Sequence, residues 1–248
     1  LLPHGNSVPS PIERDYGWPG MFQPFDHQRD TARFLTLYQR AFCFNEAGTG
    51  KTSAAIWAAD YLMSQGKVKR VLVICPLSIM QSAWQADLFK TAMHRTCAVA
   101  HGSKRRKVIQ GGYDFVIINY DGVSAEREAI SNGGFDLIIV DEANAYKNPT
   151  TVRWKILSKI IRSDTYLWMM TGTPASQSPE DAFGLARLVN PSAVPKFKTA
   201  WKDKVMRQIT RFKWAPKPDA QEHVFKALQP AIRYEKAQCL DLPDVMYQ

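Results

Sequence analysis

The chain has 248 residues, enough for a large domain with a substantial core, and its 45% hydrophobic and 22% charged content is ordinary for a globular protein. Its longest apolar run, around Val71–Cys75, is far shorter than the roughly 20 residues of a membrane span, and four scattered cysteines without a C-x-x-C pair argue against a disulfide framework or a zinc site. The net charge of +9 suits a polyanionic partner without identifying one. No signal stretch opens the chain and its first residue is Leu, so we expect a fragment of an intracellular protein with no membrane partner.

Short apolar runs alternate with helical patterns along most of the chain. Residues 1–24 are rich in Pro and Gly and predict an extended N-terminal arm. A helical pattern begins at Asp26. Apolar strands separated by helices are typical of a parallel sheet covered on both faces, which is an α/β fold. The predicted strands are Ala41–Phe44, Arg70–Ile74, Cys97–Ala100, Phe115–Asn119, Leu137–Val140 and Tyr166–Met170.

The alternation loosens after Asn190. Just before that point, Ser178 followed by Pro179 predicts the start of a helix. Residues 191–220 carry many Lys and Pro with interspersed aromatic residues. We therefore interpret residues 25–190 as one α/β domain and residues 191–248 as a basic, partly helical appendage that ends in a linker.

A glycine-rich loop directly follows the first predicted strand. Residues 45–52 read N-E-A-G-T-G-K-T and lead into a helical stretch, the context of a phosphate-binding P-loop. Glycines let backbone N–H groups turn toward phosphate oxygens, and the helix N-terminus adds partial positive charge. Lys51 would reach the β- and γ-phosphates, and the Thr52 hydroxyl would ligate Mg²⁺. The strict pattern has Gly where this chain has Asn45. The nucleotide-binding candidates here are Ala47, Gly48, Thr49, Gly50, Lys51 and Thr52.

An acidic pair ends another predicted strand. Asp141 and Glu142 follow the apolar run Leu137–Val140. A carboxylate at the carboxyl end of such a strand faces the ligand crevice of the sheet. Asp141 is therefore placed to hold Mg²⁺, and Glu142 to orient and deprotonate an attacking water. Lys51, Asp141 and Glu142 are the candidate catalytic residues.

The order of these motifs resembles that of superfamily 2 helicases, in which the P-loop, the acidic pair and a third motif, here Met170–Pro174 (M-T-G-T-P), follow one another. The finer resemblance, over about residues 24–243, is to the Swi/Snf-type branch of double-stranded DNA translocases, with phage and bacterial members closest. The other matching segments are Phe25–Gln28 (the Q motif), Cys75–Ser78 with Trp84, Ile118–Tyr120, Asp141–Asn148 (D-E-A-N-A-Y-K-N) and Arg233–Pro243. Asn144 stands where the branch usually has His.

The resemblance implies a RecA-like, ATP-binding lobe that hydrolyses ATP with Mg²⁺ and moves on DNA rather than RNA, in bacterial or infected-host cytoplasm rather than in a nucleus. It implies that Gln28 reads adenine, since a glutamine amide can pair with N6 and N7 of that base. It also implies a second RecA-like lobe of the same protein beyond this chain, without which the lobe is weakly active. The implied nucleic-acid contacts are Pro76, Leu77, Ser78, Asn119, Tyr120 and Thr171, and the implied coupling residues are Thr171, Gly172 and Thr173.

Two other classes of protein remain as alternatives. One is a different P-loop enzyme, such as a kinase or a ring-forming ATPase, against which the hydrolytic acidic pair and the T-G-T-P segment argue. The other is a nucleic-acid-binding module without motor activity, against which the intact set Lys51, Thr52, Asp141 and Glu142 argues. Trp84 and Trp201 are expected to be packing residues.

Overall fold

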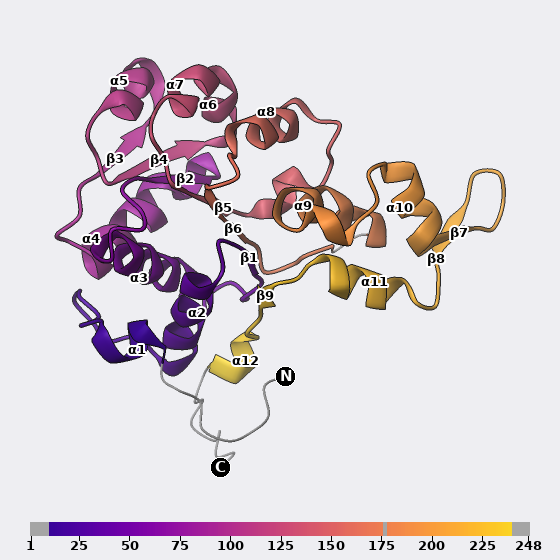
Figure 1. The fold of residues 1–248 in the computed structure, drawn as a ribbon, viewed down its shortest axis with the longest axis horizontal. Helices are drawn as coiled ribbons and strands as arrows, with labels where there is room; N and C mark the ends of the chain where they lie inside the picture. Colours follow the sequence, from indigo (N-terminus) through magenta and orange to yellow (C-terminus); the bar gives the residue numbers. More distant parts are fainter. Residues whose placement is uncertain (1–9, 176–177, 240–248) are drawn as a thin grey trace, which may run out of the picture.

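Seven parallel strands form the central sheet in this computed structural model, which describes residues 10–175 and 178–239 (Figure 1). The strands lie in the order β3-β4-β2-β5-β6-β1-β9, so their carboxyl ends share one edge of the sheet. The predicted α/β fold is confirmed, and each of the six expected strands lies within one residue of an observed one. The strands are β1 Arg40–Cys43, β2 Val71–Cys75, β3 Cys97–Ala100, β4 Phe115–Asn119, β5 Leu137–Asp141, β6 Tyr166–Met170 and β9 Ala231–Ile232.

Helices cover both faces of the sheet because each strand alternates its apolar side chains between them. Along β2, Val73 packs with the helices of one face and Leu72 with those of the other. The first face carries α1 Pro11–Asp15, α2 Asp26–Leu37, α3 Lys51–Ser64 and α4 Ala86–Thr91. The second face carries α5 Arg105–Gln110, α6 Tyr120–Ala125, α7 Arg127–Ser131, α8 Val152–Ile160, α9 Ala182–Val189, α10 Lys198–Val205 and α11 Ala220–Ala227. No helix within the described ranges, the short α12 Lys236–Cys239 included, is long and apolar enough to cross a membrane.

Helix α3, which directly follows the glycine loop, is deeply buried. Its residues from Ser53 to Leu62 are all buried, and α2 packs along it. Small side chains such as Ala54 and Ala58 let α3 lie close against its neighbours in a densely packed interior. The first turn of α3 is therefore held firmly where the glycine loop ends.

The described part of the predicted N-terminal arm, residues 10–24, packs on the domain and is not simply extended. It contains α1, whose Ile12 is fully buried, and Trp18 is buried as well. The Tyr16 hydroxyl donates to Asp60 Oδ2 at 2.6 Å. Proline fits the first turn of a helix, so Pro11 begins α1 and does not prevent it. Residues 1–9 lie outside the described residues.

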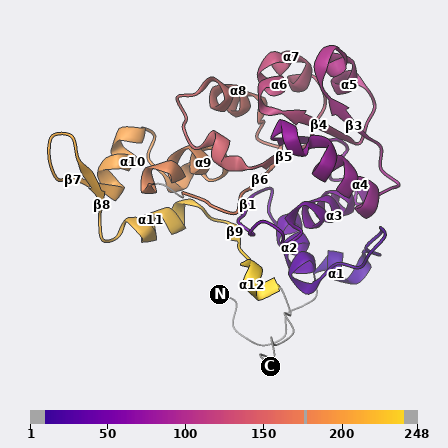
Figure 2. The same cartoon turned by 180° about the vertical axis from the view of Figure 1, so that it is seen from behind.

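The predicted appendage also belongs to the domain. Helices α10 and α11 carry Trp201, Val205 and Ala220 into the same core as the sheet, and the two residues of β9 extend the sheet beside β1. The sequence predicted a basic, partly helical appendage after residue 190, and its Lys-rich composition gave no sign of this apolar face. Between α10 and α11 lies an antiparallel hairpin of β7 Met206–Gln208 and β8 Trp214–Pro216, which projects at one end of the molecule (Figures 1 and 2). Residues 240–248, with the expected linker, lie outside the described residues.

Candidate nucleotide site

Three motifs that are distant in the sequence begin on one line across the sheet. Cys43 at the end of β1 pairs with Met170 of β6, and Met170 pairs with Asp141 of β5. Burial raises the pKa of the Cys43 thiol to about 11. The Lys51 charge lowers this pKa and the Asp141 charge raises it, but both effects are smaller than that of burial. A cavity of about 340 Å³ opens beside these strand ends. Its lining residues are Glu46, Ala47, Lys51, Glu142, Gly172 and Thr173.

The glycine loop has the backbone conformation that its sequence requires. Gly48 and Gly50 have φ values of +83° and +72°, which residues with a side chain rarely adopt. A Cβ atom on Gly50 would also lie 2.0 Å from Nε2 of Gln28. Helix α3 begins at Lys51, so the loop delivers the chain into a helix N-terminus with its free N–H groups and partial positive charge. The predicted candidates Thr49 and Thr52 flank this junction.

Asn45 replaces the first glycine of the strict pattern and holds the loop from behind. Its side chain is buried; Nδ2 donates to Thr31 Oγ1 at 2.8 Å, and Oδ1 accepts from the Tyr234 backbone N–H at 3.0 Å. The Glu46 N–H donates to the Tyr234 carbonyl at 3.0 Å. Asn45 thus ties the start of the loop both to α2 and to the segment that follows β9.

Asp141 is buried at the end of β5 and is oriented by two donors. Nε1 of the fully buried Trp84 donates to its Oδ2 at 2.9 Å, and the Glu142 N–H donates to its Oδ1 at 2.9 Å. Each carboxylate oxygen keeps a lone pair for a further partner. Glu142 is exposed, lines the cavity and has a φ of +51°, an uncommon conformation for a residue with a side chain. Such strain is often found at functional sites.

Asn144 joins the acidic pair to the M-T-G-T-P segment. Its Nδ2 donates to the Thr173 carbonyl at 2.6 Å and approaches the hydroxyls of Thr173 and Thr171 at 3.1 and 3.2 Å. The asparagine that replaces the usual histidine of the resembled branch thus makes a direct link between the two motifs. Gly172, between the two threonines, lies against the backbone of Glu46 in the glycine loop.

Gln28 lies beneath the glycine loop on α2. Its Oε1 accepts from the Phe25 N–H at 2.9 Å, and its Nε2 makes a longer contact of 3.4 Å with the Gly50 carbonyl. A neutral amide has two acceptor and two donor positions. One of each kind therefore remains, which is what pairing with the edge of adenine requires. The neighbouring His27 ring contacts the Thr49 carbonyl at 2.8 Å, a contact that the sequence did not indicate.

Residues 27–242 match the family model described as the SNF2-related domain. The chain belongs to this family. Two relatives and the solved structure of another protein illustrate the similarity. The "Uncharacterized ATP-dependent helicase YqhH" of Bacillus subtilis (strain 168) is 26% identical over 174 residues, which are 68% of this chain and 30% of that protein.

A Xenopus laevis protein, "SWI/SNF-related matrix-associated actin-dependent regulator of chromatin subfamily A-like protein 1", is 27% identical over 184 residues, 72% of this chain and 18% of that protein. The solved "Sulfolobus solfataricus SWI2/SNF2 ATPase core in complex with dsDNA" has the same fold, with a TM-score of 0.77 at 24% identity over 91% of this chain. The SNF2-related chain spans 48% of that core and less than a third of each of the two relatives.

Four of the six nucleic-acid candidates of this SNF2-related domain lie at the carboxyl ends of β2 and β4, at the same edge of the sheet as the nucleotide candidates. Pro76, Leu77 and Ser78 follow β2, and Leu77 is exposed. Asn119 ends the neighbouring strand β4. These positions agree with a surface next to the nucleotide cavity, although their contacts with nucleic acid stay a prediction.

Two of the nucleic-acid candidates have other partners. The Tyr120 hydroxyl donates to the Asp141 carbonyl at 2.7 Å. Burial is the main cause that raises the pKa of Tyr120, and the Asp141 charge is the second. Thr171 is fully buried against Asn144. The Thr171 hydroxyl therefore lies inside the domain beside the acidic-pair segment, and both roles predicted for Thr171 stay predictions.

The structure adds Trp84 to the site. The sequence predicted a packing aromatic, which its complete burial bears out. Its second role, donating to Asp141, joins residues 57 positions apart in the chain. The pairing of β2 with β5 in the sheet brings them together, and no local sequence signal identifies that pairing.

Proposed function

We propose that this chain is the ATP-binding lobe of a nucleic-acid-dependent ATPase. The ATPase would couple ATP hydrolysis to movement on DNA, with duplex DNA as its main substrate. The proposal rests on one observation. Cys43, Met170 and Asp141 are paired across three adjacent strands, and the glycine loop, the M-T-G-T-P segment and the acidic pair at the ends of these strands therefore line one cavity. The names of the relatives add support, since one is an ATP-dependent helicase and the solved core is bound to dsDNA.

The residues present fit ATP with Mg²⁺. The described residues contain no group of three or more His, Cys, Asp or Glu side chains that could hold a metal ion. Magnesium suits such a site because it binds through one or two carboxylates together with substrate phosphates and water. The Asp141 carboxylate, already oriented by Trp84, and the Thr52 hydroxyl would hold it. When bound, Mg²⁺ supplies positive charge that offsets the charge developing on the phosphates.

The side chains around the cavity would divide the work of hydrolysis. Lys51 would bind the β- and γ-phosphates together with the backbone N–H groups of residues 47–52. Glu142, exposed at the cavity wall, would orient the attacking water and accept its proton. Asn144 would carry a change at the acidic pair to Thr171 and Thr173 through the contacts described above.

The partners of the lobe would be DNA and a second RecA-like lobe. Phosphoryl transfer in such enzymes draws on an arginine that is worth about 10³–10⁵ in rate. We propose that this arginine comes from the second lobe, which would close over the cavity and complete the DNA groove. The 248 residues alone would then bind ATP with Mg²⁺ weakly and hydrolyse it slowly.

The decisive experiment measures ATP hydrolysis with and without duplex DNA, for this chain and for the protein that carries both lobes. We expect duplex DNA to raise turnover by orders of magnitude in the two-lobed protein only. Hydrolysis that DNA leaves unchanged would assign the chain to a P-loop NTPase without motor activity. Binding of DNA without hydrolysis in the two-lobed protein would assign it to a nucleic-acid-binding module.

A further inference from the structure

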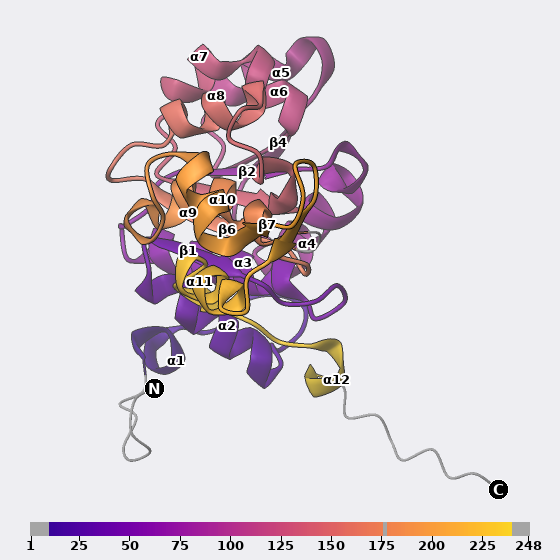
Figure 3. The same cartoon turned by 90° about the vertical axis from the view of Figure 1, so that its right-hand side faces the viewer.

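The hairpin of β7 and β8 projects at one end of the molecule (Figures 1 and 2), the end that faces the viewer in Figure 3. Its base is fixed, because Val205 and Met206 are buried and the Lys202 ammonium lies 4.2 Å from the Trp214 ring centre. Its tip, residues 209–213, is closed by backbone bonds, including one of 2.8 Å from the Ile209 N–H to the Lys213 carbonyl. The tip is thus a defined structure held away from the core.

Positive charge is concentrated in this region. Residues 196–217 contain one acidic residue, Asp203, among eight Lys and Arg residues, which is most of the excess of a chain whose net charge is +9. Within the described residues, none of the four exposed cations on and beside the hairpin has a carboxylate partner, in contrast to Lys202, which is 3.7 Å from Glu180. The four are Lys204, Arg207, Arg211 and Lys213.

An aromatic ring stands between two of these cations at the tip. Phe212 is 88% exposed, and the Arg211 guanidinium carbon lies 5.5 Å from the centre of its ring. A single exposed apolar side chain needs no explanation by itself. An exposed ring flanked by Arg211 and Lys213 offers two kinds of contact at once, cations for phosphates and a flat face for a base.

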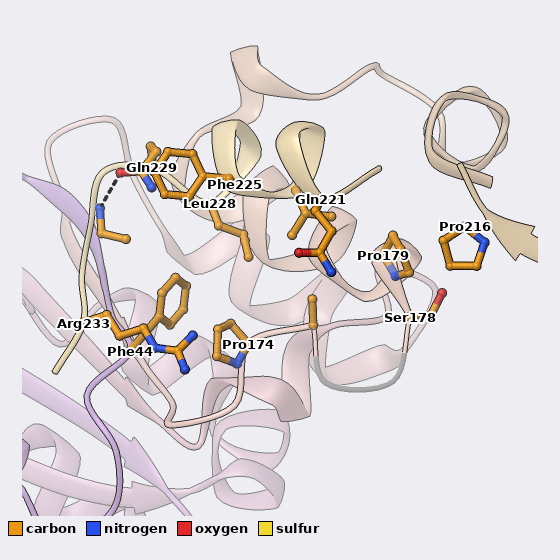
Figure 4. Close-up of a pocket in the computed structure, with 13 residues that line it drawn as sticks. Phe44, Pro174, Ser178, Pro179, Pro216, Gln221, Phe225, Leu228, Gln229 and Arg233 are labelled. Atoms are coloured by element: carbon orange, nitrogen blue, oxygen red, sulfur yellow. Dashed lines mark hydrogen bonds between the residues drawn. The ribbon is translucent and has the colours of Figure 1, made fainter. Parts of the chain in front are cut away.

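The base of the hairpin also borders a cavity that reaches the nucleotide side of the sheet (Figure 4). This cavity, of about 480 Å³, is lined by Pro216 of β8 at one end and by Phe44 and Pro174 at the other. Phe44 directly precedes the glycine loop, and Pro174 ends the M-T-G-T-P segment. The Arg233 side chain lies beside them. The cavity therefore runs from the base of the hairpin to the end of the M-T-G-T-P segment.

We propose that the β7–β8 hairpin is a second nucleic-acid contact, at which Arg207, Arg211 and Lys213 bind the phosphates of a strand and Phe212 stacks on one of its unpaired bases. This inference rests on the proposed function and adds a surface to it that lies outside the helicase-like motifs. The charge and the exposed ring together favour a nucleic-acid strand over an acidic protein, which would use the cations alone.

The charge half of the proposal is tested with the complete 248-residue chain and labelled single-stranded DNA, by fluorescence anisotropy over a range of salt concentrations. Arg211→Ala/Lys213→Ala should weaken binding and lower the slope of log Kd against log salt by about 1.4, because each single-strand phosphate contact contributes about 0.7. The matched control is Lys67→Ala/Lys69→Ala, which removes the same charge before β2, at the opposite edge of the sheet. Equal slopes for the two variants would overturn the proposal.

The base half is tested with Phe212→Ala and Phe212→Leu on a forked duplex and on a closed dumbbell duplex without unpaired bases. The alanine variant should bind the fork about fivefold or more weakly, the leucine variant should restore little of this loss, and the dumbbell should be almost unaffected. Equal losses on both DNAs, or full rescue by leucine, would overturn stacking. Because the tip is exposed, these variants should fold like the parent chain, which thermal unfolding checks.

Two further outcomes separate this inference from the proposed function. If the parent chain binds DNA and hairpin variants match the control, the hairpin is not a contact and the proposed function stands. If the parent chain and the two-lobed protein bind no DNA, both fail. Competition by polyglutamate as strong as that by single-stranded DNA, with no effect of Phe212→Ala, would assign the tip to an acidic protein and overturn the proposal.

Discussion

Replacing Trp84 by Phe tests whether the tryptophan orients the candidate metal ligand. The substitution removes the Nε1 donor that lies 2.9 Å from Asp141 Oδ2 and leaves most of the ring volume in place. Both side chains are buried, so water cannot easily replace the lost donor. The Asp141 carboxylate would keep the hydrogen bond from the Glu142 N–H to Oδ1 but would lose the one to Oδ2, so only one of its two oxygens would be held in position.

The magnitude follows from the kind of hydrogen bond. A bond to a carboxylate contributes about 1.5–3 kcal/mol to stability, and one to a neutral carbonyl about 0.5–1.5 kcal/mol. Trp168 supplies a matched control, since it is equally buried and its Nε1 donates to the Tyr38 carbonyl at 3.2 Å. Trp168→Phe loses the same ring atoms and the weaker bond. Trp84→Phe should therefore be less stable than Trp168→Phe by about 1–2 kcal/mol, a difference of roughly 2–8 °C in Tm.

Thermal unfolding of the three proteins measures this difference, and a titration of Mg²⁺ in the presence of ATP measures the effect on the site. Partners that orient a metal ligand are worth about 10–100-fold in metal affinity. Trp84→Phe should lower the Mg²⁺ affinity by that factor, whereas Trp168→Phe should leave it unchanged. Identical stabilities and identical Mg²⁺ affinities for the two variants would refute the orienting role of Trp84.

Three further predictions concern the nucleotide, the chemistry and pH. Glu142→Gln should keep ATP binding and lower turnover by about 10²–10⁴, whereas Lys51→Ala should weaken binding and turnover about tenfold or more; normal turnover of Glu142→Gln in the two-lobed protein would reassign the base. The chain should bind ATP more tightly than GTP, and Gln28→Ala should lose this preference; equal affinities in the parent chain contradict adenine reading. Burial raises the pKa of the Cys43 thiol to about 11 and of the Cys75 thiol to about 12, above the roughly 8.5 of an exposed thiol. The folded chain therefore keeps protons that the unfolded chain releases, and stability should fall above about pH 8.5, by up to about 1.4 kcal/mol per thiol and pH unit; urea unfolding at pH 8 and pH 10 should show a smaller fall in Cys43→Ala/Cys75→Ala.

The sheet and the nucleotide loop were predictable because both follow from local patterns. Buried parallel strands must be apolar on both faces, and runs such as Leu137–Val140 have no other common explanation in an alternating chain. The loop needs backbone conformations that glycine supplies, so Gly48 and Gly50 identify it. The six strands and the α/β class therefore follow from the sequence, within one residue at each strand end.

The elements that the sequence did not indicate lack such a pattern. Strand β9 has only two residues, Ala231 and Ile232, too few for a visible alternation. The hairpin strands have three residues each, among them the polar pair Arg207 and Gln208, which resemble a loop. The link from Trp84 to Asp141 depends on strand pairing across the sheet and has no local signal.

The residue at position 144 shows how a departure from a family pattern can keep the physical connection. An asparagine side chain carries two N–H donors on one nitrogen, whereas each nitrogen of a histidine ring carries one at most. From a single atom, Asn144 can therefore hold the Thr173 carbonyl and reach a threonine hydroxyl at the same time. Thr171 directly follows Met170, the last residue of β6, which pairs with both Cys43 and Asp141. The link from Asn144 therefore ends just beyond the strand that lies between β1, which leads into the glycine loop, and β5, which carries Asp141. The contact thus joins the two halves of the candidate site without passing through the nucleotide.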